Sequence, residues 1–149
     1  MMGGVKERTR VIDRSNGPGL NSFLQMETYL TEMQDRQHRM SNIIISNIKE
    51  SNQTTRSSRI LDDTNNIKAV LSPIDLDDTY KFKIQRLGKF DPENNRFINV
   101  ILPSLDHALN ILRNKNKITI PGVKIFGDQT KAQKEYYLHL KKAVNRTWR

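Results

Sequence analysis

The chain has 149 residues and no cysteine, and its 25 lysines and arginines outnumber its 16 aspartates and glutamates, for a net charge of +9. The absence of cysteine excludes disulfide frameworks, thiolate zinc sites and cysteine nucleophiles. No run approaches the roughly 18 apolar residues of a membrane span, and no apolar signal core is present, so we expect a soluble, unsecreted protein that is attracted to polyanions such as nucleic acid.

The N-terminal part predicts a tail followed by a short coiled coil. Residues 1–19 carry scattered charges and end in the helix breaker Asn16-Gly17-Pro18-Gly19, so we expect a disordered tail. Over residues 20–41 an a/d heptad seam, with alternating spacings of three and four residues, predicts a self-associating helix. The expected oligomerisation residues are Phe23, Met26, Leu30, Met33, Gln37 and Met40. Because the seam is shorter than three heptads, an amphipathic helix packed on its own domain is the alternative.

The rest of the chain alternates between strand and helix periodicity. The pattern predicts a strand at 43–45, a helix over 60–74, strands over 80–85 and 97–102, a helix over 105–115, a strand over 123–126 and a helix over about 129–147. A polar loop over 49–58 precedes the first of these helices, and Pro73 is expected to end it. Ser104 is expected to cap the second helix and Asp128 the last.

Helical spacing also predicts which side chains face inward. These are Ile60, Ile67, Val70, Leu71 and Ile74 in the first helix, Leu105, Ala108, Leu109 and Leu112 in the second, and Ala132, Tyr136, Leu140, Val144 and Trp148 in the last.

The order of elements over residues 42–127 is strand, helix, strand, strand, helix, strand, which predicts an α+β, ferredoxin-like βαββαβ domain. An RNA-recognition-motif domain has this order. Residues 43–48 look like the shorter motif of that family, with Ile44 where a base-stacking aromatic usually stands. Residues 95–102 lie where the longer motif is expected, with Phe97 at one stacking position and Asn99 where the second aromatic would be. Since stacking supplies about 1–3 kcal/mol per base, sequence-tolerant binding is expected here in place of base reading.

The charge is unevenly distributed along the chain. Between residues 50 and 78 six acids face three bases, whereas nine bases face three acids between residues 81 and 124, and the last helix adds six bases against one acid. Such polarity suits phosphate neutralisation by lysine and arginine, with salt-sensitive binding. A solvated charged surface is the alternative interpretation.

A narrower resemblance covers residues 23–149. It rests on the heptad helix leading through Arg39-Met40-Ser41-Asn42 into the first strand, on Gln85-Arg86-Leu87-Gly88-Lys89, on residues 96–100 followed by residues 108–112, and on Asp128-Gln129-Thr130 before a basic, tyrosine-containing helix. In this order the segments resemble the first open-reading-frame protein of non-LTR (LINE-type) retrotransposons.

That resemblance implies a protein that multimerises through its coil as a trimer or dimer, and that coats RNA or single-stranded DNA in a ribonucleoprotein of the cytoplasm or nucleus. The family's C-terminal domain is normally longer, so residues 128–149 are expected to be the start of a truncated one. With the basic terminal helix included, the expected nucleic-acid-binding residues are Arg86, Lys89, Arg96, Phe97, Asn99, Arg113, Lys115, Lys117, Lys141, Lys142 and Arg146.

Catalysis has little support in the sequence. His38, His107 and His139 lie on separate predicted helices without metal-ligand spacing, and no Gly-rich phosphate loop or nucleophile elbow is present. We therefore expect no enzyme activity, no cofactor, no metal and no membrane partner. A second function class remains open, a protein-interaction module whose sheet face contacts a partner or is covered by the C-terminal helix.

Overall fold

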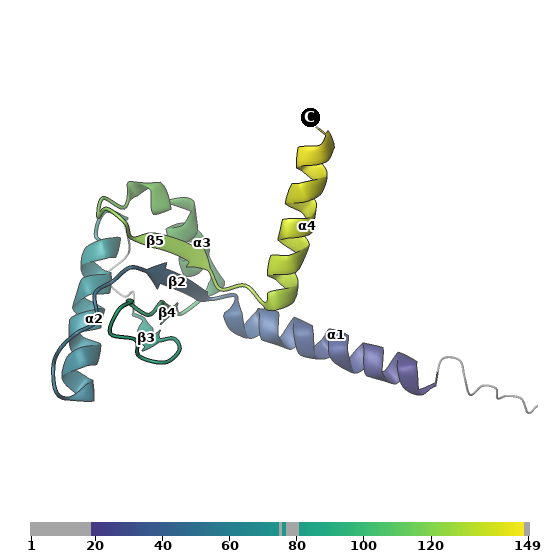
Figure 1. The fold of residues 1–149 in the computed structure, drawn as a ribbon, viewed down its shortest axis with the longest axis horizontal. Coiled ribbons are helices and arrows are strands. Elements are labelled where there is room, and N and C mark those ends of the chain that lie inside the picture. Colours follow the sequence, from purple (N-terminus) through teal and green to yellow (C-terminus); the bar gives the residue numbers. More distant parts are fainter. Residues whose placement is uncertain (1–18, 75, 77–80, 148–149) are drawn as a thin grey trace, which may run out of the picture. The chain divides into compact units, whose positions relative to one another are not determined.

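The computed structural model describes residues 19–74, 76 and 81–147, and it divides the chain into two units, residues 1–36 and 37–149 (Figure 1). The predicted tail lies outside the described residues except for Gly19, and so do Tyr80 and Trp148. No helix in the described part of the chain is both long enough and apolar enough to span a bilayer.

The first unit is built around α1 (Leu20–Arg39), which confirms the helix predicted there. None of its residues is buried, and Phe23, Met26 and Leu30 of the heptad seam are more than half exposed. The helix ends at Arg39, so Met40 lies in the turn after it and not on the helical seam.

The second unit confirms the α+β class. In chain order it contains β2 (Asn42–Ser46), α2 (Arg56–Leu71), β3 (Lys83–Arg86), β4 (Ile98–Ile101), α3 (Leu105–Arg113), the 3-10 turn η3 (Lys115–Lys117), β5 (Lys124–Gly127) and α4 (Lys131–Thr147). The four strands form one sheet in the order β3-β4-β2-β5, and each neighbouring pair is antiparallel. β3 and β5 are therefore its edge strands.

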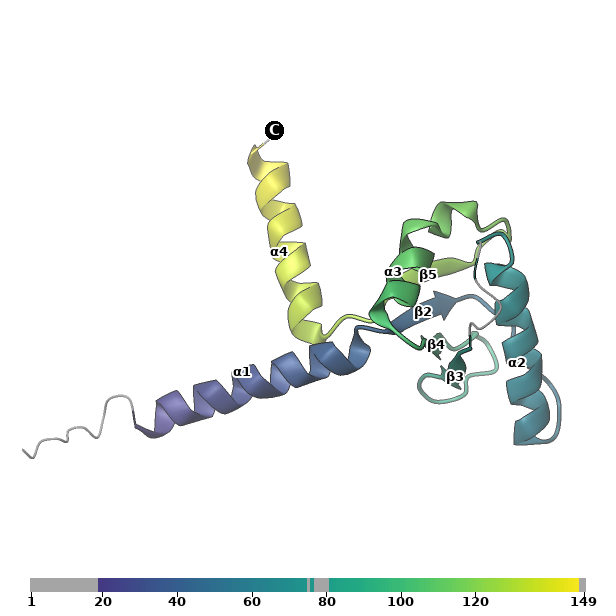
Figure 2. The same cartoon turned by 180° about the vertical axis from the view of Figure 1, so that it is seen from behind.

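The core lies between one face of this sheet and the helices α2 and α3. Ile43 and Ile45 of β2 alternate with exposed or half-buried neighbours, as do Ile98 and Val100 of β4, and all four are fully buried. This period of two is what a sheet with one buried face requires. α3 packs on β2 and β5 and adds Ile111 to the core, so the other face of the sheet carries neither α2 nor α3 (Figure 2).

The helix boundaries differ from the predicted ones where a cap decides them. α2 begins at Arg56, inside the predicted polar loop, because the Thr55 side chain accepts a hydrogen bond from the Ser58 N–H. The helix ends at Leu71, before Pro73, as predicted. Ile60 was expected to face inward but is exposed, since it lies in the early turns of the longer helix.

In α3 the predicted N-cap is confirmed, because the Ser104 hydroxyl accepts from the His107 N–H. The buried residues of α3 are Ala108 and Ile111, whereas Leu105 was expected inside and is exposed. The inward face is therefore rotated from the predicted one.

The predicted cap of the last helix is wrong. Thr130 and Gln133 form a reciprocal capping box, in which the Thr130 hydroxyl accepts from the Gln133 backbone N–H at 3.1 Å and the side-chain Oε1 atom of Gln133 accepts from the Thr130 backbone N–H at 2.9 Å. Asp128 instead accepts hydrogen bonds from Arg39 at 3.0 Å and from Asn42 at 3.1 Å. Those long-range partners occupy the carboxylate that was expected to cap α4.

The predicted inward face of α4 is also wrong. Tyr136, Leu140 and Val144 are each about half exposed, and Ala132 is exposed as well. These side chains do not bury the sheet face that carries Phe97.

Candidate nucleic-acid interface

The open face of the sheet is defined by the strand register. Ile44 in β2 pairs with Asn99 in β4 on one side and with Phe126 in β5 on the other, and Asn99 pairs in turn with Gln85 in β3. Residues paired across antiparallel strands point to the same face. One row of side chains, with Gln85 and Phe126 at its ends, therefore crosses the whole sheet opposite the core.

Two phenylalanines stand on this face. Phe97, immediately before β4, is 53% exposed, as expected for a stacking position, and Phe126 in β5 is 44% exposed. Phe126 was missed from the sequence, although the signal was present. Alternation in the predicted last strand, with Ile125 inside, places Phe126 outside.

Asn99 lies on the same face, two residues after Phe97 in β4 and separated from Phe126 by Ile44 of β2. Its Oδ1 atom is buried and has no hydrogen-bond partner in the described part of the chain. An unpaired buried acceptor is costly to the folded state. Asn99 thus places a buried acceptor without a partner at the centre of the row, among the described residues.

Lysines border the face on both edge strands. Lys83 in β3 and Lys124 in β5 are exposed, and alternation places them on the same face as Gln85 and Phe126. Lys89, in the turn after β3, is exposed too. Of these three lysines only Lys89 was predicted to bind nucleic acid, because the charge of a segment does not reveal which face of a strand its lysines occupy.

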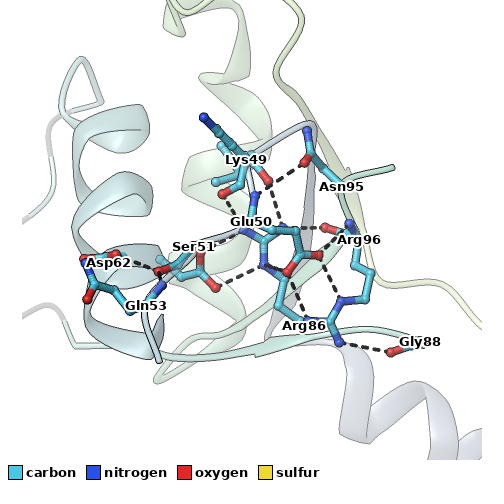
Figure 3. Close-up of polar contacts among 11 residues, drawn as sticks. Lys49, Glu50, Ser51, Gln53, Asp62, Arg86, Gly88, Asn95 and Arg96 are labelled. Atoms are coloured by element: carbon cyan, nitrogen blue, oxygen red, sulfur yellow. Dashed lines mark hydrogen bonds and ion pairs between the residues drawn. The ribbon is translucent and has the colours of Figure 1, made fainter. Parts of the chain in front are cut away.

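Arg86 has a structural role in place of the predicted phosphate contact (Figure 3). Its Nε and Nη2 atoms bind the two carboxylate oxygens of Asp63 at 3.0 and 2.8 Å. The Nη1 atom donates to the Ile48 and Arg96 carbonyls at 2.8 and 2.7 Å, and Nη2 also donates to the Lys49 carbonyl at 3.0 Å. A guanidinium has five N–H groups, so all of them are engaged and none is left for a phosphate.

Burial explains why this arrangement is so complete. The side chains of Arg86 and Asp63 are only 9% and 7% exposed, and a charge removed from water must be paired and hydrogen-bonded. The pair joins α2 to β3, and the carbonyl contacts add the segment after β2 and the start of β4.

Arg96 is partly engaged. It forms a bidentate pair with Glu50, at 2.9 Å from Nε to Oε2 and 3.0 Å from Nη2 to Oε1, and its Nη1 donates to the Gly88 carbonyl (Figure 3). The hydrogen bond from Arg96 is the main reason that the pKa of Glu50 is lowered, and the same contact raises the pKa of Arg96. The guanidinium also lies 5.7 Å from the centre of the Phe90 ring. Arg96 is therefore a neutralised charge.

The other predicted basic residues are exposed but lie elsewhere. Arg113, Lys115 and Lys117 belong to the last turn of α3 and to η3, in the helical layer that covers the opposite face of the sheet. The structure therefore does not bring them together with Phe97 and Asn99. On α4 the predicted residues are all exposed; they are Lys141, Lys142 and Arg146.

The predicted oligomerisation residues are exposed on α1, apart from Met33, which is half-buried, and Met40, which follows the helix. Among the residues that the structure describes, no group of three histidine or acidic side chains is placed to hold a metal ion.

Comparison of the chain with models of known protein families and with curated proteins finds no match.

Proposed function

We propose that residues 42–127 form a ferredoxin-like domain of the RNA-recognition-motif type, and that its open face binds single-stranded nucleic acid, RNA in particular, with little sequence preference. The observation that carries the proposal is the uncovered sheet face, where Phe97 and Phe126 stand exposed around Ile44 and Asn99. The central position of the first and third strands of this domain in the sheet supports the fold assignment.

The chemistry of the face suits an unpaired strand. Bases stack on exposed aromatic rings whatever their identity, and lysines on the two edge strands supply charge for the phosphates. Lys83 and Lys124 are exposed and form no ion pair within the described residues, so their full charge is available to a polyanion. Ile44 stands where RNA-recognition motifs usually have an aromatic residue. Phe126 of the neighbouring strand β5 is paired with Ile44, so the face still has a second ring on which a base can stack.

The place of this domain in a retrotransposon-derived ribonucleoprotein is part of the same proposal. It is supported by the order of segments in the sequence and by the exposed apolar seam of α1, since Phe23, Met26 and Leu30 have water as their neighbour unless another helix covers them. We expect the full chain to self-associate through that seam, as a dimer or trimer.

Fluorescence anisotropy with a labelled, mixed-sequence RNA of about 30 nucleotides tests the interface. Each base lost from a stacking ring costs about 1–3 kcal/mol, so replacing Phe97 and Phe126 together by alanine should weaken binding at least about tenfold. Tyr29→Ala is the matched control, because Tyr29 is equally exposed but lies on α1. Binding by the double variant within about twofold of the wild type, with an unchanged circular dichroism spectrum, would show that the open face is not the site.

A salt titration tests the electrostatic part separately. If several phosphates are neutralised, the logarithm of the affinity falls linearly with the logarithm of the salt concentration. Replacing Lys83 and Lys124 by glutamine should reduce that slope by about two, one for each lysine. An unchanged slope would remove both lysines from the interface.

A further inference from the structure

A groove separates the start of α2 from the edge strand β3. It has a cavity volume of about 320 Å³, with Arg56, Arg59 and Ile60 of α2 on one wall and Ile84 and Gln85 of β3 on the other. That volume is at the lower end of the range for ligand sites, about 300–1,000 Å³. The groove runs beside the sheet edge, and apart from Gln85 none of these residues belongs to the open face.

The edge of β3 presents its main chain to this groove. The Leu87 N–H donates to the Phe97 carbonyl, and in this register Gln85 and Lys83 are the next residues bonded to β4. Hydrogen-bonded pairs alternate along an antiparallel ladder. The N–H and C=O groups of Ile84 and Arg86 therefore point away from β4, and they form no backbone hydrogen bond with another loop or turn in the described part of the chain.

The residues that line the groove carry a net positive charge once the side chains paired with each other are counted as neutral. Asp63 and Glu50 line it, but each is bound by an arginine, Arg86 and Arg96 respectively. Arg59 donates to two backbone carbonyls, those of Gln53 and Thr54, which leaves its charge uncompensated.

Arg56 adds a second uncompensated charge. It is exposed, and neither it nor Arg59 has a carboxylate partner among the residues that the structure describes. Both arginines belong to the first turn of α2 and line the groove.

From these features we propose that the groove is a docking site for an extended acidic peptide of a partner protein, which adds a strand to the free edge of β3. The strand edge offers donors and acceptors in alternation, and an extended polypeptide supplies both in return at the same repeat. A phosphodiester backbone supplies acceptors alone, so it would leave the outward carbonyls of Ile84 and Arg86 unpaired. Ile60 and Ile84 provide apolar contact, and Arg56 and Arg59 select acidic side chains in the same strand.

The probe is a fluorescein-labelled peptide of about eight residues, with threonine at alternate positions and valine or glutamate at the positions between them. Added to the full chain, it should bind saturably and shift the amide NMR signals of Ile84 and Arg86. Arg56→Glu should weaken binding at least about tenfold. Lys68→Glu is the matched control, because Lys68 is exposed at the far end of the same helix and does not line the groove.

A second probe makes the test independent of any variant's folding. The same peptide methylated on every backbone nitrogen has no N–H group on either edge to donate to β3, so its binding should be lost. The proposal is overturned by failure of the parent peptide to bind, by equal binding of the methylated peptide, or by equal binding to Arg56→Glu. It is also overturned if RNA, but no peptide, shifts the Ile84 and Arg86 amides, which would make the groove part of the nucleic-acid surface.

Discussion

Replacement of Arg86 by methionine should destabilise the domain and leave intrinsic RNA affinity nearly unchanged. Methionine keeps much of the side-chain volume but leaves the Asp63 carboxylate, 7% exposed, without its bidentate partner. Removing one member of a buried ion pair typically costs about 3–5 kcal/mol, because the remaining charge is buried and uncompensated. The carbonyls of Ile48, Lys49 and Arg96 lose their donor as well. We expect a loss at the upper end of that range.

Urea unfolding followed by far-UV circular dichroism measures this loss. With a slope of about 2 kcal/mol per molar urea, a loss of about 5 kcal/mol lowers the midpoint by about 2.5 M. Lys89→Met is the control, because Lys89 is exposed and surface substitutions usually change stability by less than about 0.5 kcal/mol. A midpoint within about 0.3 M of the wild type, together with a tenfold loss of RNA binding, would refute the reasoning and restore Arg86 as a phosphate contact.

Three further outcomes are expected. The hydrogen bonds from Arg96 lower the pKa of Glu50, so ionised Glu50 stabilises the fold above its unfolded pKa of about 4.3. That stability is lost as the pH falls through the lower folded pKa, so the urea midpoint below about pH 4.3 should fall more steeply for the wild type than for Glu50→Gln. Equal pH profiles of the two proteins would contradict this role of Glu50. Replacing Leu30 and Met33 by glutamine should convert an α1-mediated oligomer into a monomer in sedimentation, and an unchanged mass would exclude the seam. Thr130→Ala should destabilise α4 by about 1 kcal/mol and lower helical circular dichroism, whereas an unchanged spectrum would mean that the capping box contributes nothing.

Local sequence patterns predict most of the helices and strands that the structure contains. The alternation at Ile43-Ile44-Ile45 and around Ile98 and Val100 places the buried face of the sheet correctly, because a period of two has only one way to bury one face. Phe97 follows from the same alternation, as an exposed ring beside buried Ile98.

The capping of α4 and the second aromatic of the open face were available in the sequence but were not used. Thr130-x-x-Gln133 is a capping-box signature, whereas Asp128 follows the glycine that ends the last strand and lies two residues before the cap. Phe126 is on the outer face by the alternation that places Ile125 inside.

The role of Arg86 could not be predicted from local patterns. Its carboxylate partner is 23 residues away in the chain, and its three carbonyl partners come from two other segments. Only the folded sheet brings these groups together, and an arginine in a basic segment has the same sequence environment whether it is buried or exposed. The exposure of Tyr136, Leu140 and Val144 on α4 could not be predicted either, because helical spacing identifies an apolar face but not whether another element covers it.

The contacts of Asp128 have a consequence for how the domain is attached to the rest of the chain. Arg39, just before β2, and Asn42, its first residue, both donate to the carboxylate of Asp128, which follows β5. The chain therefore enters and leaves this domain at neighbouring positions. The two points are neighbours because β2 and β5 are adjacent and antiparallel. Tension applied between the segments before residue 39 and after residue 128 would therefore load the two contacts of Asp128 first, and would then separate β5 from β2 one residue pair at a time, starting at Ile43 and Gly127.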